Sequence, residues 1–119
     1  MPYYSTLGFK IQEISNGKAH FEMVIRKELT QFGMIHGGVL ASLIDSTCAC
    51  TAFSLILPNG NTITIDLQIE FLRKVSKGHL KAIAKCIISG KNIFFCKAKV
   101  WDEEGNLMSA GSSQLLRVR

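Results

Sequence analysis

The 119-residue sequence lacks the features that divide a chain into separate units or direct it to another compartment. It contains no linker, internal repeat or low-complexity tract, and its length suffices for one hydrophobic core, so we expect a single domain over residues 1–119. Residues 2–7 are too short and too polar for a signal sequence. Without such a signal, the simplest expectation is a cytoplasmic protein.

Metal-binding and disulfide patterns are also missing, although the chain has four cysteines. Cys48 and Cys50 are two residues apart in a predicted helix and therefore point to different faces, whereas Cys86 and Cys96 occupy inward-facing positions of predicted strands. We interpret all four as small buried hydrophobic residues. The sequence therefore predicts neither a metal site nor a redox cofactor.

The excess of basic residues comes without a nucleic-acid-binding signature. The net charge is +5 and the sequence pI is about 9.2. We find no helix-turn-helix, no zinc spacing and no strand motif that combines aromatic with basic residues, so neither nucleic acid nor a membrane is expected as a partner. The lysines and arginines are spread over predicted strand faces and turns, where they are either solvated or bind a small polyanion with several phosphates.

Lysine, arginine and glutamate are absent from residues 39–57, which we predict to form one buried helix closed by Pro58-Asn59-Gly60. At about 1.5 Å per residue this run would span roughly 28 Å, nearly enough to cross a bilayer. Polar residues such as Asp45 and Thr51, and the lack of basic and aromatic flanks, argue against a membrane span. A helix that is apolar nearly all round must instead be wrapped by the rest of the chain.

Alternating polar and apolar residues predict six strands around this helix. They cover residues 9–14, 18–26, 62–71, 80–88, 93–101 and 107–118. The alternation points Ile88 inward, puts Thr64 on the polar face of its strand, and assigns to the buried face of that strand Ile63, Ile65, Leu67, Ile69 and Phe71. Asn16-Gly17 predicts a hairpin turn. Because short connections force antiparallel neighbours, we expect an α+β fold with one antiparallel sheet curled around one helix.

The chemical signal lies at the start of the predicted helix, in the sequence His36-Gly37-Gly38. Two glycines directly before an apolar helical run leave backbone N–H groups that can hold developing negative charge. Asp45 follows nine residues after His36, inside a segment that is otherwise apolar or small, where an ionised carboxylate is costly unless it is used. An oxyanion site and a carboxylate together indicate acyl chemistry.

His36-Gly37-Gly38, the following Val39-Leu40 and Asp45 resemble the signature of the hotdog-fold acyl-CoA thioesterases of the phenylacetate-pathway type, which are related to the 4-hydroxybenzoyl-CoA thioesterases. The resemblance covers roughly residues 7–118, because the predicted turns fall where this family has counterparts. It implies a hotdog fold, in which a curved sheet wraps around one long central helix, and hydrolysis of acyl-CoA thioesters to free acid and coenzyme A. Coenzyme A then enters as part of the substrate, and no separate cofactor is implied.

The spacing of the motif also bears on assembly. Nine residues place Asp45 about 13 Å along the helix from His36 and on roughly the opposite side, so one chain cannot bring both to one carbonyl. A two-fold dimer can, with the helix start of one chain meeting Asp45 of its partner. The resemblance implies the same composite sites and, in many members, a tetramer of two dimers. We therefore expect a homodimer and, beyond it, a dimer of dimers.

In the mechanism that the resemblance implies, a backbone N–H of Gly37 or Gly38 stabilises the oxyanion, and Asp45 acts as general base on water or as nucleophile. His36 takes part in this site or only caps and orients the loop. Thr64 matches a position whose hydroxyl orients the attacking water, or it is an ordinary strand threonine.

One position departs from the family, since relatives often carry an asparagine six residues before the histidine and this chain has Thr30. Threonine can donate one hydrogen bond but has no amide carbonyl.

For the coenzyme, the resemblance points to the turn Ser89-Gly90-Lys91-Asn92, where glycine lets phosphate oxygens approach the backbone, and more weakly to Arg73 and Lys74. These residues are equally consistent with an ordinary turn and surface. Three other functions stay open, namely a hydratase or dehydratase of acyl thioesters, a non-catalytic acyl-CoA-binding protein, and a structural dimer with a decayed site. The acyl group is not specified, because the sequence does not rank Phe32, Met34, Phe53 and Met108 as pocket linings.

Overall fold

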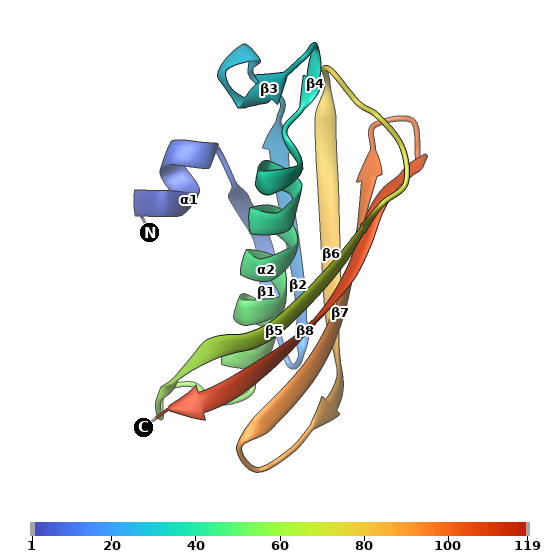
Figure 1. Cartoon of the computed structure of the whole chain (residues 1–119). Coiled ribbons are helices and arrows are strands. Elements are labelled where there is room, and N and C mark those ends of the chain that lie inside the picture. The colour runs from blue at the N-terminus through green and yellow to red at the C-terminus, as the bar shows by residue number, and fades with distance from the viewer. Residues whose placement is uncertain (1, 119) are drawn as a thin grey trace.

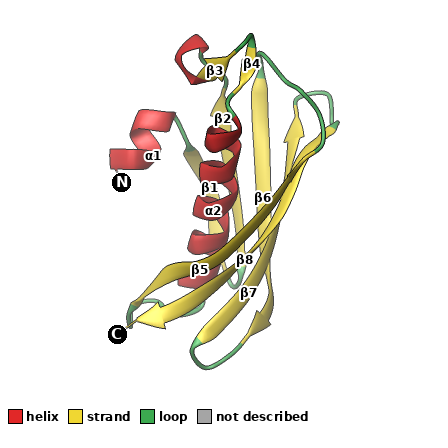
Figure 2. Cartoon of the chain, in the orientation of Figure 1, coloured by secondary structure: helices red, strands yellow, loops and turns green. Residues whose placement is uncertain are grey.

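The structure, a computed structural model, describes residues 2–118 of the predicted unit. One long helix, α2 (Gly37–Phe53), lies against a six-stranded antiparallel sheet that curls around it (Figure 1; Figure 2). The strands of this sheet are β1 (Lys10–Ser15), β2 (Lys18–Val24), β5 (Asn61–Phe71), β6 (His79–Ser89), β7 (Ile93–Asp102) and β8 (Leu107–Val118). The smaller elements are α1 (Pro2–Leu7), the 3-10 turn η1 (Lys27–Leu29), β3 (Thr30–Gln31) and β4 (Met34–Ile35). The predicted α+β architecture is confirmed.

The six strands follow the order β1-β2-β6-β7-β8-β5, and every neighbouring pair is antiparallel. Ser15 pairs with Lys18, so the β1–β2 loop consists of Asn16 and Gly17 alone. Both residues have positive φ, 43° and 82°, as the tight hairpin turn predicted for this dipeptide requires. β1 and β5 form the two edges of the sheet.

Helix α2 begins two residues earlier and ends four residues earlier than the sequence predicts, since residues 54–58 form turns. Ser54 marks the end, because its hydroxyl donates to the Thr51 carbonyl (2.7 Å) and accepts from the Gly17 N–H (2.8 Å). Leu43 and Ile44 are fully buried, as expected for a wrapped helix. In the part of the chain that the structure describes, no helix is long and apolar enough to cross a bilayer.

Strand β5 departs from the predicted alternation because it contains a β-bulge. Its pairing with β8 shifts at Ile65, which has no partner on β8. Before the bulge, Thr64 faces α2 and Ile63 is 50% exposed. The bulged Ile65 is also 50% exposed, and after it Leu67 and Ile69 pack on the core. A bulge exchanges the faces to which the following residues point. The prediction that all five apolar residues of this strand share the buried face is therefore wrong, as is the placement of Thr64 on the polar face.

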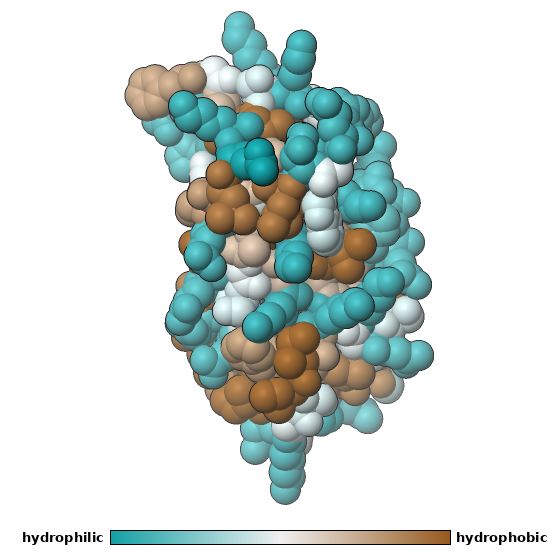
Figure 3. Space-filling view, turned by 90° about the vertical axis from the view of Figure 1, so that its right-hand side faces the viewer, coloured by the Kyte–Doolittle hydropathy of each residue, from teal (hydrophilic) through white to brown (hydrophobic). Residues whose placement is uncertain are grey.

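A second bulge, between Cys86 and Ile88 in the pairing of β6 with β7, turns Ile88 outward. Ile88 is 62% exposed, whereas the sequence predicts that it points inward. Exposed hydrophobic residues are not confined to this place. In the view from the right-hand side of Figure 1, hydrophobic patches lie among hydrophilic residues (Figure 3).

Candidate functional site

The start of helix α2 is closed by the side chain of His36. Its backbone is extended (φ −66°, ψ 134°), and its Nδ1 accepts a hydrogen bond from the Gly38 N–H at 2.8 Å. Because a backbone N–H can only donate, Nδ1 carries no proton in this contact, and the neutral imidazole holds its proton on Nε2. Of the two predicted roles of His36, capping is the one that this geometry displays.

This cap distinguishes the two glycines. The Gly38 N–H is occupied by His36, whereas within residues 2–118 the Gly37 N–H has no hydrogen-bond acceptor. The ring of Phe71, at the end of β5, lies against Gly37, so that a Cβ at position 37 would be 3.4 Å from its Cε1 and Cζ. Gly37 thus presents an open donor at the positive end of a helix, beside an apolar wall. Such a donor can stabilise an oxyanion.

Asp45 lies more than two turns further along α2 and is half-buried. Its Oδ1 accepts a hydrogen bond from the Thr64 hydroxyl at 2.7 Å. The bulge at Ile65 accounts for this contact, because regular alternation would point Thr64 away from the helix. The structure therefore brings two of the predicted site residues together, by a feature that the sequence does not reveal.

Two tyrosines of α1, a helix that the sequence did not predict, pack against α2 near Asp45. The Tyr3 hydroxyl lies 2.6 Å from Ser42 Oγ, and the Tyr4 hydroxyl lies 3.7 Å from Cys50 Sγ. Burial raises the pKa of the Tyr4 phenol, and the nearby Cys50 thiol and Asp45 carboxylate raise it further. Asp45 therefore has a neutral phenol as well as a threonine in its surroundings.

The cysteines around Asp45 are poor nucleophiles. All four cysteines are free, and Cys48, Cys50 and Cys96 are buried, in line with their interpretation as small hydrophobic residues. Burial raises the pKa of the Cys48 thiol to about 12, and the Asp45 carboxylate contributes to this shift. A thiol with this pKa is protonated at neutral pH and unreactive. The Cys48 thiol therefore does not compete with the Asp45 carboxylate as a base or nucleophile at neutral pH.

Within one chain, the two halves of the candidate site do not meet. α2 runs without interruption from Gly37 to Phe53, which places Asp45 about 12 Å along the axis from Gly37. The two residues also face different parts of β5, since Gly37 lies against Phe71 and Asp45 against Thr64. One carbonyl group cannot contact both, as the spacing in the sequence predicts.

Thr30, the residue that departs from the family pattern, lies in β3. Its hydroxyl donates to the Lys27 carbonyl at 2.7 Å and so closes the η1 turn. The next turn along the chain carries Phe32, which is 90% exposed and has a positive φ of 53°. In this structure Thr30 therefore stabilises the loop that leads to His36.

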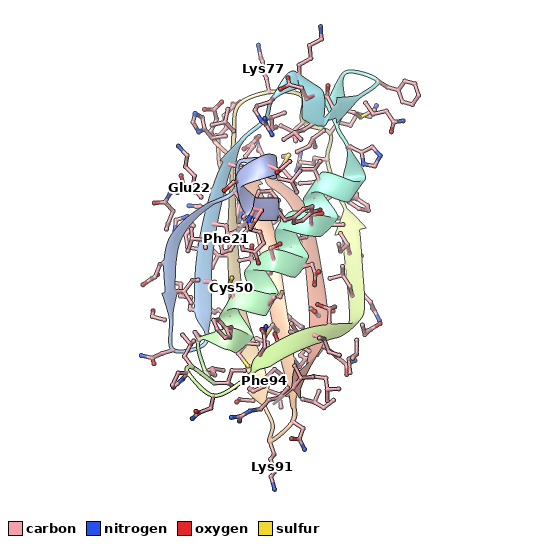
Figure 4. All side chains as sticks on the ribbon, turned by 90° about the vertical axis from the view of Figure 1, so that its left-hand side faces the viewer. Phe21, Glu22, Cys50, Lys77, Lys91 and Phe94 are labelled. Carbon is pink, nitrogen blue, oxygen red and sulfur yellow. The ribbon has the colours of Figure 1, made fainter. Side chains whose placement is uncertain are left out.

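The two groups of predicted coenzyme-binding residues occupy opposite ends of the molecule. The turn Ser89-Gly90-Lys91-Asn92 joins β6 to β7, and Lys91 projects from the end opposite to Lys77 (Figure 4). Arg73 and Lys74 follow β5, in the loop that leads to Lys77. Gly90 also has a structural role, because a Cβ there would lie 2.7 Å from the Ile93 carbonyl oxygen. One chain does not bring the two groups together.

Comparison with known proteins relates this arrangement to a family. Residues 32–109 match the sequence model of the thioesterase superfamily. A Haemophilus influenzae protein that bears the name "putative esterase" is 31% identical over 105 residues, which cover 87% of this chain and 75% of that protein. A Mycobacterium tuberculosis protein with the same designation is 24% identical over 119 residues, covering 97% of this chain and 85% of that protein.

Solved structures share the fold over nearly the whole chain. A thioesterase from Haemophilus influenzae has a TM-score of 0.92 at 24% identity, with 98% of this chain and 82% of that chain covered. A thioesterase family protein from Silicibacter pomeroyi also has a TM-score of 0.92 at 24% identity, with 99% of this chain and 90% of that chain covered. These likenesses, together with the sheet topology, confirm the predicted hotdog fold.

Proposed function

This chain belongs to the thioesterase superfamily, and on that premise we propose that it hydrolyses acyl-CoA thioesters to a free acid and coenzyme A. The observation that carries the proposal is the presence of an open Gly37 N–H at a helix start together with an Asp45 carboxylate held by Thr64. The first group suits the oxyanion of a tetrahedral intermediate. The second can act as a general base or a nucleophile.

We place the active site between two copies of the chain. β5 is an edge strand with half-exposed Ile63 and Ile65, and a second copy can extend the sheet by pairing antiparallel with it across a two-fold axis. Antiparallel pairing sets opposite ends of the two chains side by side. The helix start of one subunit then approaches Asp45 of the partner subunit. The two groups, which are too far apart within one chain, can thus contact one substrate.

In this site the thioester carbonyl accepts a hydrogen bond from the Gly37 N–H. Asp45 of the partner subunit takes a proton from a water molecule that attacks the carbonyl carbon, and the resulting oxyanion is stabilised by Gly37 and the helix dipole. When the intermediate collapses, the C–S bond breaks and the departing thiolate receives that proton from Asp45. Direct attack by Asp45, which forms an anhydride that water then opens, uses the same geometry.

The same two-fold arrangement would bring together the two groups of predicted coenzyme-binding residues, which lie at opposite ends of one chain. Arg73 and Lys74 follow Phe71 and therefore lie at the end of the sheet where Gly37 begins its helix. The Ser89-Gly90-Lys91-Asn92 turn lies at the other end, which antiparallel pairing brings beside the first end of the partner. We therefore propose that both groups bind the coenzyme phosphates, each from a different subunit.

A panel of short-chain, long-chain and aromatic acyl-CoA esters tests the function, with thiol release as the readout and the oligomeric state measured in parallel. We expect turnover of at least one class by a dimer or a larger assembly. Tight binding of these esters without thiol release would replace hydrolysis by non-catalytic binding. A change in enoyl-CoA absorbance without thiol release would indicate a hydratase instead.

A further inference from the structure

The face of the sheet that points away from α2, here called the outer face, carries a row of lysines in register. Lys18 on β2 lies opposite Lys85 on β6, and Lys85 lies opposite Lys97 on β7. Like charges directly opposite each other on neighbouring strands destabilise a sheet. Lys99 adds a fourth positive charge two residues further along β7 on the same face. This cluster of four lysines raises the question of what offsets its repulsion.

In the described chain, no carboxylate forms an ion pair with the cluster. Within residues 2–118 the ion pairs are His20–Glu22 and Arg26–Glu28, so none of the four lysines has an acidic partner within 4.0 Å. Lys85, Lys97 and Lys99 are exposed. Their positive charge is therefore available to an anion from outside the chain.

The cluster borders a hollow of about 800 Å³ in the outer face. This volume lies in the range of pockets for small molecules. Besides the lysines, the lining includes the side chains of Trp101, Ile83 and Gln68. Gln68 and Ser112, which pair across β5 and β8, continue the lysine row with neutral polar groups. The hollow thus combines charge, hydrogen-bonding groups and one large aromatic ring.

Aromatic and charged groups are spaced along β7. Phe95, Lys97, Lys99 and Trp101 all lie on the outer face, so the expectation that no strand combines aromatic with basic residues is wrong for β7. Trp101 follows Lys97 by four residues, which corresponds to about 13 Å at 3.3 Å per residue. Lys81 already approaches the Trp101 ring, with its Nζ 5.9 Å from the ring centroid. A ligand that spans this distance would carry a planar ring at one end and negative charge at the other.

We propose that the outer face binds a nucleotide with two or more phosphates, with its base against Trp101 and its phosphates on Lys85 and Lys97. The site lies across the sheet from Asp45 and is separate from the proposed active site. The ligand chemistry is shared by two sources, a free nucleoside di- or triphosphate and the nucleotide end of coenzyme A.

Other occupants fit this surface less well. A single-stranded nucleic acid needs a basic groove that follows several nucleotides, whereas this cluster covers one row and a neighbouring lysine, with Glu70 also lining the hollow. A second copy of the chain, docked face to face, would oppose lysines to lysines. A nucleotide instead matches the hollow in size, charge and ring content.

The single tryptophan of the chain is Trp101, so selectively excited tryptophan fluorescence reports on this hollow. Titration with ATP, ADP and coenzyme A, with isothermal calorimetry in parallel, is expected to give a saturable fluorescence change. Lys85→Glu is expected to raise the Kd at least 10-fold, whereas Lys27→Glu, an exposed lysine on η1, leaves it unchanged. Lys85→Gln is expected to raise the Tm of the free protein by about 1–4 °C, because it relieves the repulsion within the row.

The arms of the titration separate the two sources. A Trp101 fluorescence change that saturates with ATP and ADP but not with coenzyme A, and that Lys85→Glu weakens, identifies a free nucleotide; the same signal with coenzyme A alone identifies the coenzyme in this hollow. The proposal is overturned by the absence of saturable binding at millimolar concentration, by inorganic pyrophosphate binding as tightly as ATP, by an oligonucleotide binding more tightly than ATP, or by equal effects of the Lys27 and Lys85 variants. Asp45→Asn is expected to keep nucleotide binding intact, so failure of the hydrolase proposal does not affect this one.

Discussion

The Thr64 hydroxyl donates a 2.7 Å hydrogen bond to Oδ1 of Asp45, joining the edge strand to the central helix. Removing this donor should loosen the carboxylate without removing it. Thr64→Val keeps the branched shape and is expected to lower kcat about 10-fold or more, since hydrogen bonds to charged groups contribute about 1.5–3 kcal/mol. Thr64→Ser keeps the hydroxyl and should retain most of the activity. If Thr64→Val retains the activity and Thr64→Ser loses it, the threonine methyl group and not its hydroxyl is what matters.

Asp45→Asn is expected to lower kcat by about 10²-fold or more, because the amide preserves the shape but can neither take a proton nor attack. Binding of the acyl-CoA ester and the thermal stability should change little. Asp66→Asn, an amide substitution of the same kind on β5, serves as the matched control and should leave kcat unchanged. Normal turnover by the Asp45 variant would remove this residue from the mechanism.

A mixing experiment tests the shared site. Gly37→Pro removes the open N–H at the first helical position, where proline is well tolerated, and the extended His36 (ψ 134°) already has the conformation that a following proline requires. Each variant alone is expected to be inactive. Heterodimers of Asp45→Asn with Gly37→Pro subunits contain one intact site and should regain measurable turnover. No recovery, despite verified subunit exchange, would place both groups in one subunit or elsewhere.

Lys91→Glu is expected to raise KM for acyl-CoA esters several-fold with little change in kcat, because a phosphate contact is made equally in the ground and transition states. The effect should shrink with added salt, since an exposed contact is screened over about 8 Å at physiological ionic strength. An acyl-pantetheine substrate lacks the nucleotide and should be unaffected. Lys10→Glu provides the control. Equal losses with both substrates would assign Lys91 to the fold or the acyl pocket.

The buried thiol of Cys48 predicts a pH dependence of stability. Folding raises its pKa from 9.0 to about 12, mainly through burial, so the folded state favours the protonated thiol. The stabilisation is complete below pH 9 and is lost as the pH rises toward 12. The free energy of unfolding should therefore decline over this interval, and less steeply in Cys48→Ala. Iodoacetamide at pH 8 should label Cys48 in urea but not in the folded protein.

The order of the long helix and the six long strands, and the turn at Asn16-Gly17, could be predicted because their signals are local. Hydrophobic alternation and turn residues need no knowledge of distant partners. The helix start at His36 was recognisable for the same reason, since its cap is formed within three residues.

The features that the sequence did not reveal depend on tertiary contacts. The bulge at Ile65, which aims Thr64 at Asp45, arises only in the pairing of β5 with β8. Helix α1 has six residues, too few to show a period, and it packs through Tyr4, whose ring lies 5.5 Å from that of Phe21. The lysine row unites Lys18 with Lys85, and strand register alone makes them neighbours.

The unpaired edge of β5 also affects how a single chain associates with other chains. Within residues 2–118, the outer side of this eleven-residue strand pairs with no other strand and lies beside exposed Ile63 and Ile65, so it is a template for another extended chain. The proposed pairing with a second copy therefore competes with aggregation for the same surface. The bulge at Ile65 breaks the regular spacing of this edge, so an incoming strand finds few registers that fit. The bulge that points Thr64 toward Asp45 thus also disfavours pairing of β5 with strands of other sequences.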